Sequence, residues 1–160
     1  MAQPTTPRYC PARELPRERS MPGNSPRGAW HGRELPDDLM PPWQWRESGA
    51  WLFAVDLWNG GYFWEAWEVW EGLWRQASPV NPLQARFIQG LVMLAGAMVH
   101  QERGWGEAEE SLFRNGILLI QSVRAETGPS FMGLPLDAFT AFLEASRNTR
   151  QPAPILLEPW

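Results

Sequence analysis

The stretch FWEAWEVWEGLWR, residues 63–75, places four tryptophans and three glutamates within thirteen positions. At about 100° per residue, a helix gathers the apolar side chains on one arc and the charged ones on the opposite arc. The apolar arc holds Tyr62, Phe63, Ala66, Trp67, Val69, Trp70, Leu73 and Trp74. The pattern therefore predicts an amphipathic helix whose tryptophans anchor a core. Trp64 is the exception, because it projects from the charged side.

Helical signals continue on both sides of this stretch. Asn81 and Pro82 suit the start of a helix, and Gln84 sits where a capping box requires a polar side chain. No run longer than four residues alternates as a strand. We expect the last helix to turn Phe139, Phe142 and Leu143 inward. The predicted helices span about 43–58, 62–76, 82–103, 107–127 and a shorter segment after 135. The fold class is all-α, a compact array of four to five helices, in which the third helix is apolar nearly all round and lies centrally.

The N-terminal part differs in composition from the rest. Residues 1–42 hold nine of the sixteen prolines and show no sustained period, which predicts an extended arm that is partly disordered. The predicted organisation is the arm at 1–42, a helical domain at 43–147 and a C-terminal tail at 148–160.

Charge and cysteine content narrow the function classes. The net charge of −4 argues against nucleic acid as a partner, because phosphate binding needs a basic face. The longest nearly apolar stretch, Phe87–Val99, is shorter than the roughly 20 residues of a membrane span. A single cysteine, Cys10, excludes an intramolecular disulfide, and the first thirty residues contain no apolar segment typical of a secretory signal. These features predict a cytoplasmic protein with no membrane or nucleic-acid partner.

The glutamates of the central stretch are the candidates for catalysis. Glu65, Glu68 and Glu71 stand at i, i+3 and i+6 and repel one another, and Arg75 offsets part of this through an i, i+4 pair with Glu71. If a second element covers them, their charges must be matched, because an unpaired buried carboxylate is too costly. If the face is open to water, no partner is required.

The third predicted helix supplies candidate partners for these acids. Arg86, Gln89 and His100 fall on one stripe of it. We expect Arg86 and Gln89 to face the glutamates across the helix interface. The alternative places Arg86 in solvent on the first turn and His100 on the last, with Gln89 satisfied by backbone. The candidate binding residues are thus Arg86, Gln89 and His100, with Trp64 and Trp67 from the central stretch.

WNGGYFWEAWEVWEGLW, followed by RFIQGLVMLAGAM, resembles the bacterial family known as domain of unknown function 309. The resemblance covers roughly residues 51–123 and implies a small all-helical fold, with the label of predicted metal-dependent hydrolase. The matching residues, in order, are Asn59, Gly60, Glu65, Ala66, Glu68, Glu71, Trp74, Gln89, Gly90 and Leu91.

Two family histidines are replaced in this chain. Trp67 stands at the histidine of the family's E-A-H-E motif, and Arg27 at that of its P-H-P segment. Neither side chain can ligate a metal as imidazole does. The chain keeps two histidines, His31 and His100. A metal site would therefore need carboxylates alone, or carboxylates together with one of these histidines. We expect no metal and leave any cofactor unknown.

Three functions remain open. The chain is a binding or self-association module, whose partner is a second copy or a small-molecule ligand met by Trp43, Trp45, Trp64 and the tail PILLEPW. It is a metal-assisted hydrolase using Glu65, Glu68 and Glu71. Or it is a scaffold, in which the polar cluster only fixes helix register. Binding is the favoured interpretation, and the question of catalysis stays open with a leaning against it.

Overall fold

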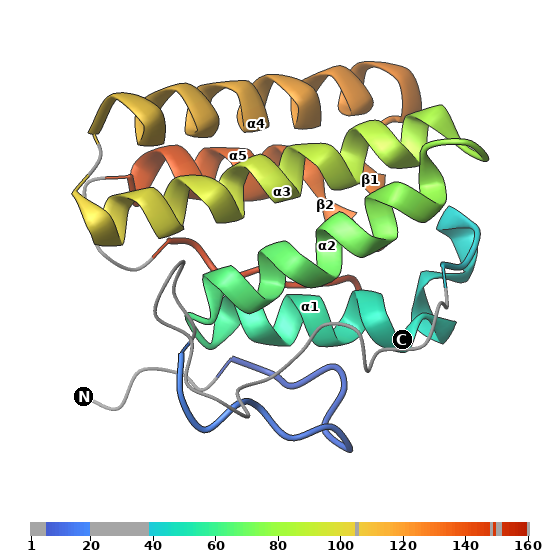
Figure 1. The fold of residues 1–160 in the computed structure, drawn as a ribbon. Coiled ribbons are helices and arrows are strands. Elements are labelled where there is room, and N and C mark those ends of the chain that lie inside the picture. Colours follow the sequence, from blue (N-terminus) through green and yellow to red (C-terminus); the bar gives the residue numbers. More distant parts are fainter. Residues whose placement is uncertain (1–5, 20–38, 105, 148, 150–151, 160) are drawn as a thin grey trace.

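The structure is a computed structural model that describes residues 6–19, 39–104, 106–147, 149 and 152–159. The described residues form an all-α fold, as predicted, with one very short β-hairpin (Figure 1). Arg27, at the position of a family histidine, and His31, one of the two histidines of the chain, lie outside the described residues.

The first helical region is broken rather than continuous. Pro42–Glu47 forms a 3₁₀ helix, η2, and helix α1 follows at Gly49–Asn59. The break falls at Ser48, whose side-chain oxygen accepts a hydrogen bond from the backbone N–H of Trp51 at 3.2 Å. The single helix predicted from Trp43 is therefore wrong, because this serine caps a new helix instead of continuing the old one.

The next two helices follow their sequence signals closely. Helix α2 is Phe63–Ala77, and helix α3 is Pro82–Arg103. The side chain of Asn81 accepts from the backbone N–H of Gln84 at 3.1 Å, as the capping prediction requires. The second half of the capping box does not form, because the Gln84 amide donates instead to the Met40 carbonyl at 2.8 Å.

A hairpin separates the last two helices, α4 at Gly106–Thr127 and α5 at Leu136–Ala145. Its strands, β1 and β2, are two residues each and pair antiparallel, Phe131 opposite Leu134. The turn between them has two residues of positive φ, Met132 at 48° and Gly133 at 76°, which matches the right-handed twist of a tight hairpin.

The hairpin also buries one tryptophan that was expected to meet a partner. A Cβ built on Gly133 would lie 2.4 Å from the Trp45 ring, so only glycine lets the indole pack there. Trp45 is buried as a result, and its predicted role as an exposed anchor is wrong. Trp43, by contrast, is 76% exposed.

Helix α3 lies at the centre, with α2 on one side and α4 on the other (Figure 1). By length and composition it is the one described helix that could cross a membrane, yet 61% of that window is buried inside the molecule. This is the arrangement of a core helix, whose apolar faces are covered by neighbouring helices.

Helix α1 is covered by chain from both ends of the sequence. All nine residues from Ala50 to Trp58 are buried. Residues 6–19 run beside α1 in Figure 1, and the C-terminal segment 152–159 crosses it from the side of α5. These two segments explain why a helix with no exposed face lies at the edge of the helical array.

Candidate functional site

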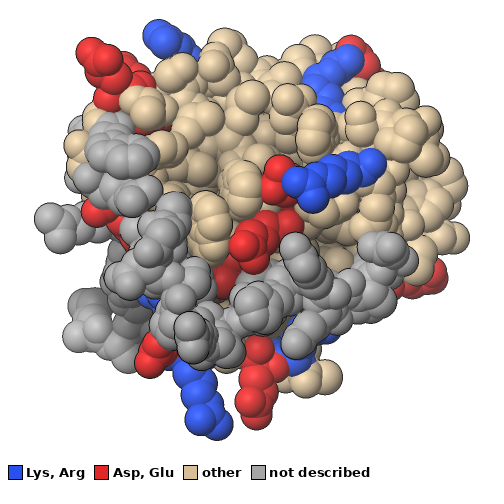
Figure 2. Space-filling model, viewed as in Figure 1, with Lys and Arg blue, Asp and Glu red and all other residues tan. Residues whose placement is uncertain are grey.

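The three glutamates of α2 lie at different depths. Glu65 has no exposed surface, whereas Glu68 and Glu71 are half-buried. Glu71 forms the predicted i, i+4 ion pair with Arg75, at 3.0 Å. Figure 2 shows acidic side chains in the middle of the face on which α2 lies. The alternative of a fully solvated acidic face is therefore wrong for Glu65.

The two tryptophans nominated on α2 pack on each other. The Trp64 and Trp67 rings are stacked, with centroids 5.0 Å apart and planes 16° apart, and both side chains are half-buried. Trp70 is fully buried and packs against Trp58 of α1. Trp64 therefore does not project alone from a charged face, and Trp67 is only partly in the core.

Arg86 has a different partner from the one expected. Its guanidinium forms an ion pair with Glu126 at 2.8 Å. The physical reason is that α3 and α4 pack closely and run in opposite directions (Figure 1), so that the start of α3 meets the end of α4. The prediction that Arg86 matches an acid of α2 is wrong.

Gln89 and His100, the other two predicted residues of α3, do not join Arg86 in one site. Both are half-buried. Among the described residues, no hydrogen bond joins the Gln89 side chain to an acid of α2. Arg86 and His100 are fourteen residues apart, which is about 21 Å along a helix. The residues of α3 therefore do not surround one ligand of ordinary size.

The described residues include no group of three or more His, Cys, Asp or Glu side chains that could hold a metal ion. Glu65, Glu68 and Glu71 follow one another along α2, and no imidazole among the described residues completes a group with them. A ligand set for zinc or a similar ion needs three or four converging donors.

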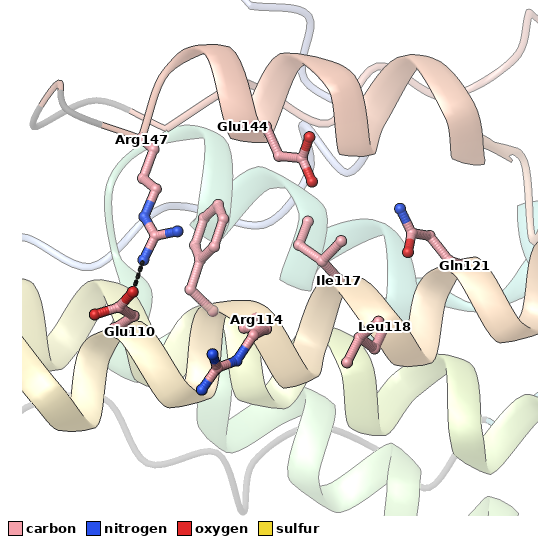
Figure 3. Close-up of a pocket in the computed structure, with 8 residues that line it drawn as sticks. Glu110, Arg114, Ile117, Leu118, Gln121, Glu144 and Arg147 are labelled. Carbon is pink, nitrogen blue, oxygen red and sulfur yellow. Dashed lines mark ion pairs between the residues drawn. The ribbon is translucent and has the colours of Figure 1, made fainter.

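A groove of about 400 Å³ lies between α4 and α5 (Figure 3). Its floor is apolar, formed by the buried side chains of Phe113 and Ile117, and Leu118 at its lip is 56% exposed. The polar residues that line it are Glu110, Arg114, Gln121, Glu144 and Arg147.

The charges around this groove are only partly matched. Arg147 forms an ion pair with Glu110 at 3.7 Å, and its guanidinium also lies 4.8 Å from the centroid of the Phe113 ring. Within the described part of the chain, neither Arg114 nor the side chain of Glu144 has an ion-pair or hydrogen-bond partner. The groove thus offers an apolar floor between one arginine and one glutamate that are both uncompensated.

No motif marks this groove in the sequence. Its residues come from α4, from α5 and from the turn just after α5, with Glu110 and Arg147 thirty-seven positions apart. The prediction for α5 was correct in part. Phe139 and Leu143 are buried as expected, but Phe142 is 59% exposed, so its predicted inward position is wrong. The one available signal is the i, i+4 pattern of Glu110, Arg114 and Leu118, which reads as an ordinary solvent face.

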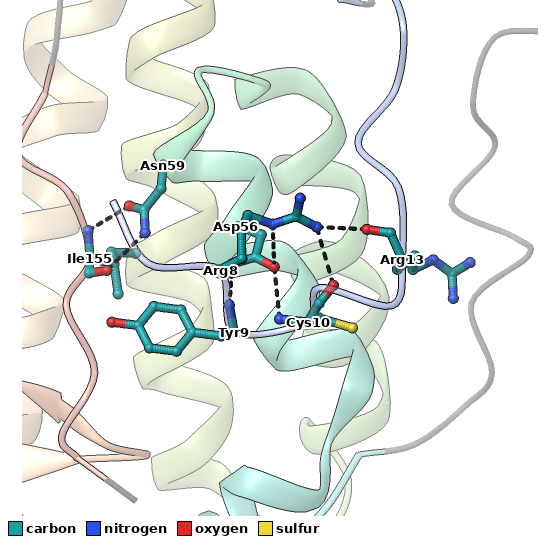
Figure 4. Close-up of polar contacts among 7 residues, drawn as sticks. All are labelled: Arg8, Tyr9, Cys10, Arg13, Asp56, Asn59 and Ile155. Atoms are coloured by element: carbon teal, nitrogen blue, oxygen red, sulfur yellow. Dashed lines mark hydrogen bonds and ion pairs between the residues drawn. The ribbon is translucent and has the colours of Figure 1, made fainter. Parts of the chain in front are cut away.

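A second polar cluster lies on α1, at Asp56 (Figure 4). The Asp56 carboxylate accepts the backbone N–H groups of Tyr9 and Cys10, each at 2.8 Å, and pairs with Arg8 at 2.9 Å. Burial, and then the charge of Asp56, raise the pKa of the Cys10 thiol. The sequence signal for this cluster is the single acid within the apolar run WLFAVDLW.

These features define a class: a small all-α domain with a central apolar helix, an acidic helix packed on it, and a surface groove on its far side. The family model described as Domain of unknown function (DUF309) matches residues 51–111, from α1 to the start of α4. Over these residues the chain is similar to that family, as the resemblance indicated. No curated protein and no solved structure matches the chain.

Proposed function

We propose that the protein is a binding module whose partner at the α4–α5 groove is a second copy of the chain. The observation that carries this proposal is the charge of the groove, where Arg114 and Glu144 lack partners among the described residues. A two-fold interface must be complementary to itself, because each copy presents the same patch to the other. One arginine and one glutamate meet that condition, since Arg114 of each copy can pair with Glu144 of the other.

The apolar lining of the groove supports the same proposal. Leu118 is 56% exposed beside the buried Phe113 and Ile117. Covering the remaining surface of such a leucine contributes about 1 kcal/mol per copy, because full burial of a leucine is worth about 1.5–3 kcal/mol. The ion pair between Arg147 and Glu110 lies at one end of the groove (Figure 3).

Metal-assisted hydrolysis by Glu65, Glu68 and Glu71 receives less support from the geometry. These carboxylates succeed one another on a single helix, and among the described residues no side chain of another element completes a metal-binding group with them. A location in the cytoplasm fits the unpaired Cys10, and the net charge of −4 fits a protein partner better than a nucleic acid.

Sedimentation velocity across a concentration series tests the proposal on the full chain. We expect wild type to show a monomer–dimer equilibrium that weakens with added salt, because its Arg114–Glu144 pairs are partly exposed. Arg114→Glu and Glu144→Arg should each weaken association at least about 10-fold, since each places like charges opposite one another. The double exchange of the two residues should restore it.

A matched pair of variants separates the groove from general surface effects. Leu118→Asp should abolish association, whereas Val80→Asp should not, because Val80 is 78% exposed in the turn between α2 and α3. Wild type that stays monomeric at every concentration contradicts the proposal. So does a double exchange that fails to recover what the single changes lose.

A further inference from the structure

The C-terminal segment 152–159 lies extended on the molecule, outside any helix or strand. Its side chains alternate between buried and exposed positions. The buried ones are Ala153, Ile155 and Leu157, at 5%, 0% and 8% exposure, and Leu156 between them is 50% exposed. This alternation is how an extended peptide fits a row of pockets, one pocket for every second residue.

Helix α1 holds the backbone of this segment through two adjacent side chains. The indole Nε1–H of Trp58 donates to the Ala153 carbonyl at 3.0 Å. The Asn59 amide donates to the Ile155 carbonyl at 2.9 Å and accepts from the Ile155 N–H at 2.7 Å (Figure 4). The Asn59 side chain therefore hydrogen-bonds to both the N–H and the carbonyl of Ile155, as the backbone of a neighbouring β-strand would.

Two other parts of the molecule also hold the backbone of segment 152–159, and together with α1 they form the groove in which this segment lies. The hydroxyl of Tyr9, in the N-terminal arm, accepts from the backbone N–H of Leu157 at 2.9 Å. The carbonyl of Gly133, in the hairpin, accepts from the N–H of Glu158 at 2.8 Å. Four of these five hydrogen bonds are made by side chains of the groove, and all five reach only the backbone of the segment.

We propose that this groove is a docking site for extended peptides of other proteins, with the chain's own tail as its intramolecular ligand. From the buried residues of the bound tail we infer the sequence that a partner should have: a small residue, an isoleucine and a leucine at alternate positions of an extended segment. Backbone contacts supply affinity for any such segment, and the buried positions of Ala153, Ile155 and Leu157 supply the preference. This site is separate from the α4–α5 groove and does not depend on self-association.

The tail competes with a partner peptide for this site. A peptide from a partner binds only the fraction of molecules whose tail has left, so its apparent affinity is reduced by that fraction. The tail can leave without unfolding a helix, because it contributes no residue to a helix or strand. A change that weakens the tail alone should therefore strengthen binding of a peptide.

Fluorescence anisotropy of a labelled peptide PAPILLEP, the sequence of residues 152–159, tests this in the full chain. We expect weak binding to wild type and at least about 10-fold tighter binding to Ile155→Asp, whose tail cannot fill its central pocket. Leu156→Asp is the matched control and should bind as wild type does, because this neighbour points outward. Adding Asn59→Ala to Ile155→Asp should remove the gain.

The proposal is overturned if folded Ile155→Asp binds the peptide no more tightly than wild type. If that variant does not fold, wild type labelled with ¹⁵N supplies the test: excess peptide should move the amide signals of residues 153 and 155–158 to unfolded positions, and unchanged signals overturn the proposal. Sedimentation of Ile155→Asp should match wild type, which separates this site from the α4–α5 groove. Dimers formed by exchange of tails, lost on Ile155→Asp, would assign the groove to a second copy and also overturn it.

Discussion

One carboxylate holds the N-terminal arm against the helical domain. Asp56 has no exposed side-chain surface, and it meets the backbone N–H groups of Tyr9 and Cys10 and the guanidinium of Arg8. A buried carboxylate is tolerated when its charge and its lone pairs are both satisfied. Because all three donors come from consecutive residues, a single side chain of α1 fixes the position and direction of residues 8–10.

The same contact predicts how the single cysteine responds to pH. Burial and the nearby Asp56 charge raise the pKa of the Cys10 thiol, so the folded state holds this proton more tightly than the unfolded state. The resulting stability is present below the ordinary pKa of the thiol and is lost as pH rises through the raised value. Alkylation by iodoacetamide should therefore reach its half-maximal rate at higher pH in the folded chain than in urea. Equal midpoints in the two states would contradict the assignment, and no other thiol contributes to the signal.

At the scale of elements, a pair of glycines sets how closely α3 and α4 approach. A Cβ on Gly116 would lie 2.9 Å from the Gly90 carbonyl oxygen and 2.8 Å from Cγ of Leu94. A Cβ on Gly90 would lie 3.2 Å from the Gly116 carbonyl oxygen. Each glycine therefore accommodates the backbone of the other helix, and the two helices meet backbone to backbone at this point.

Gly116→Ala should lower the free energy of unfolding by about 1–2 kcal/mol, because overpacking at the crossing outweighs the better helix propensity of alanine. Gly72→Ala is the matched control: it also lies inside a helix, but its Cβ would meet no atom within 4 Å. That control should stabilise the protein by about 0.5–1 kcal/mol. Urea unfolding measures both, and equal stabilisation by the two changes would show that the helices do not meet as closely as described.

The elements themselves were largely predictable, because local chemistry sets their ends. Asn81 and Gly104 mark α3 in the sequence and also in the structure, where Gly104 has a φ of 74°. The break at Ser48 was missed, since a serine between two apolar runs reads equally well as a helical residue.

The candidate site was predicted less well than the elements. Its polar contacts depend on which helix ends meet, and no local pattern encodes that. Arg86 illustrates this, because its partner Glu126 lies forty positions away on an element whose direction only the packing decides.

At the scale of the molecule, residues 6–19 of the arm and residues 152–159 of the tail form one covering layer over α1. The arm is fixed by Asp56 and the tail by Asn59, one turn apart on the same helix. The two segments also touch each other, through the hydrogen bond from the N–H of Leu157 to the hydroxyl of Tyr9. Since this is the only hydrogen bond between them among the described residues, it should determine whether they open together or separately.

Hydrogen exchange tests this coupling, with peptides from residues 6–19 and 152–159 as the two reporters. Arg8→Gln should speed exchange in the arm, because it removes the ion pair to Asp56, and should also speed exchange in the tail by about 2–10-fold. In a chain that also carries Tyr9→Phe, the tail should no longer respond to Arg8→Gln. Arg75→Gln is the control, since it breaks an exposed ion pair on α2 and should leave both reporters unchanged. A tail that ignores Arg8→Gln while Tyr9 is intact would mean that the two ends of the chain open independently, each held to α1 by its own side chain.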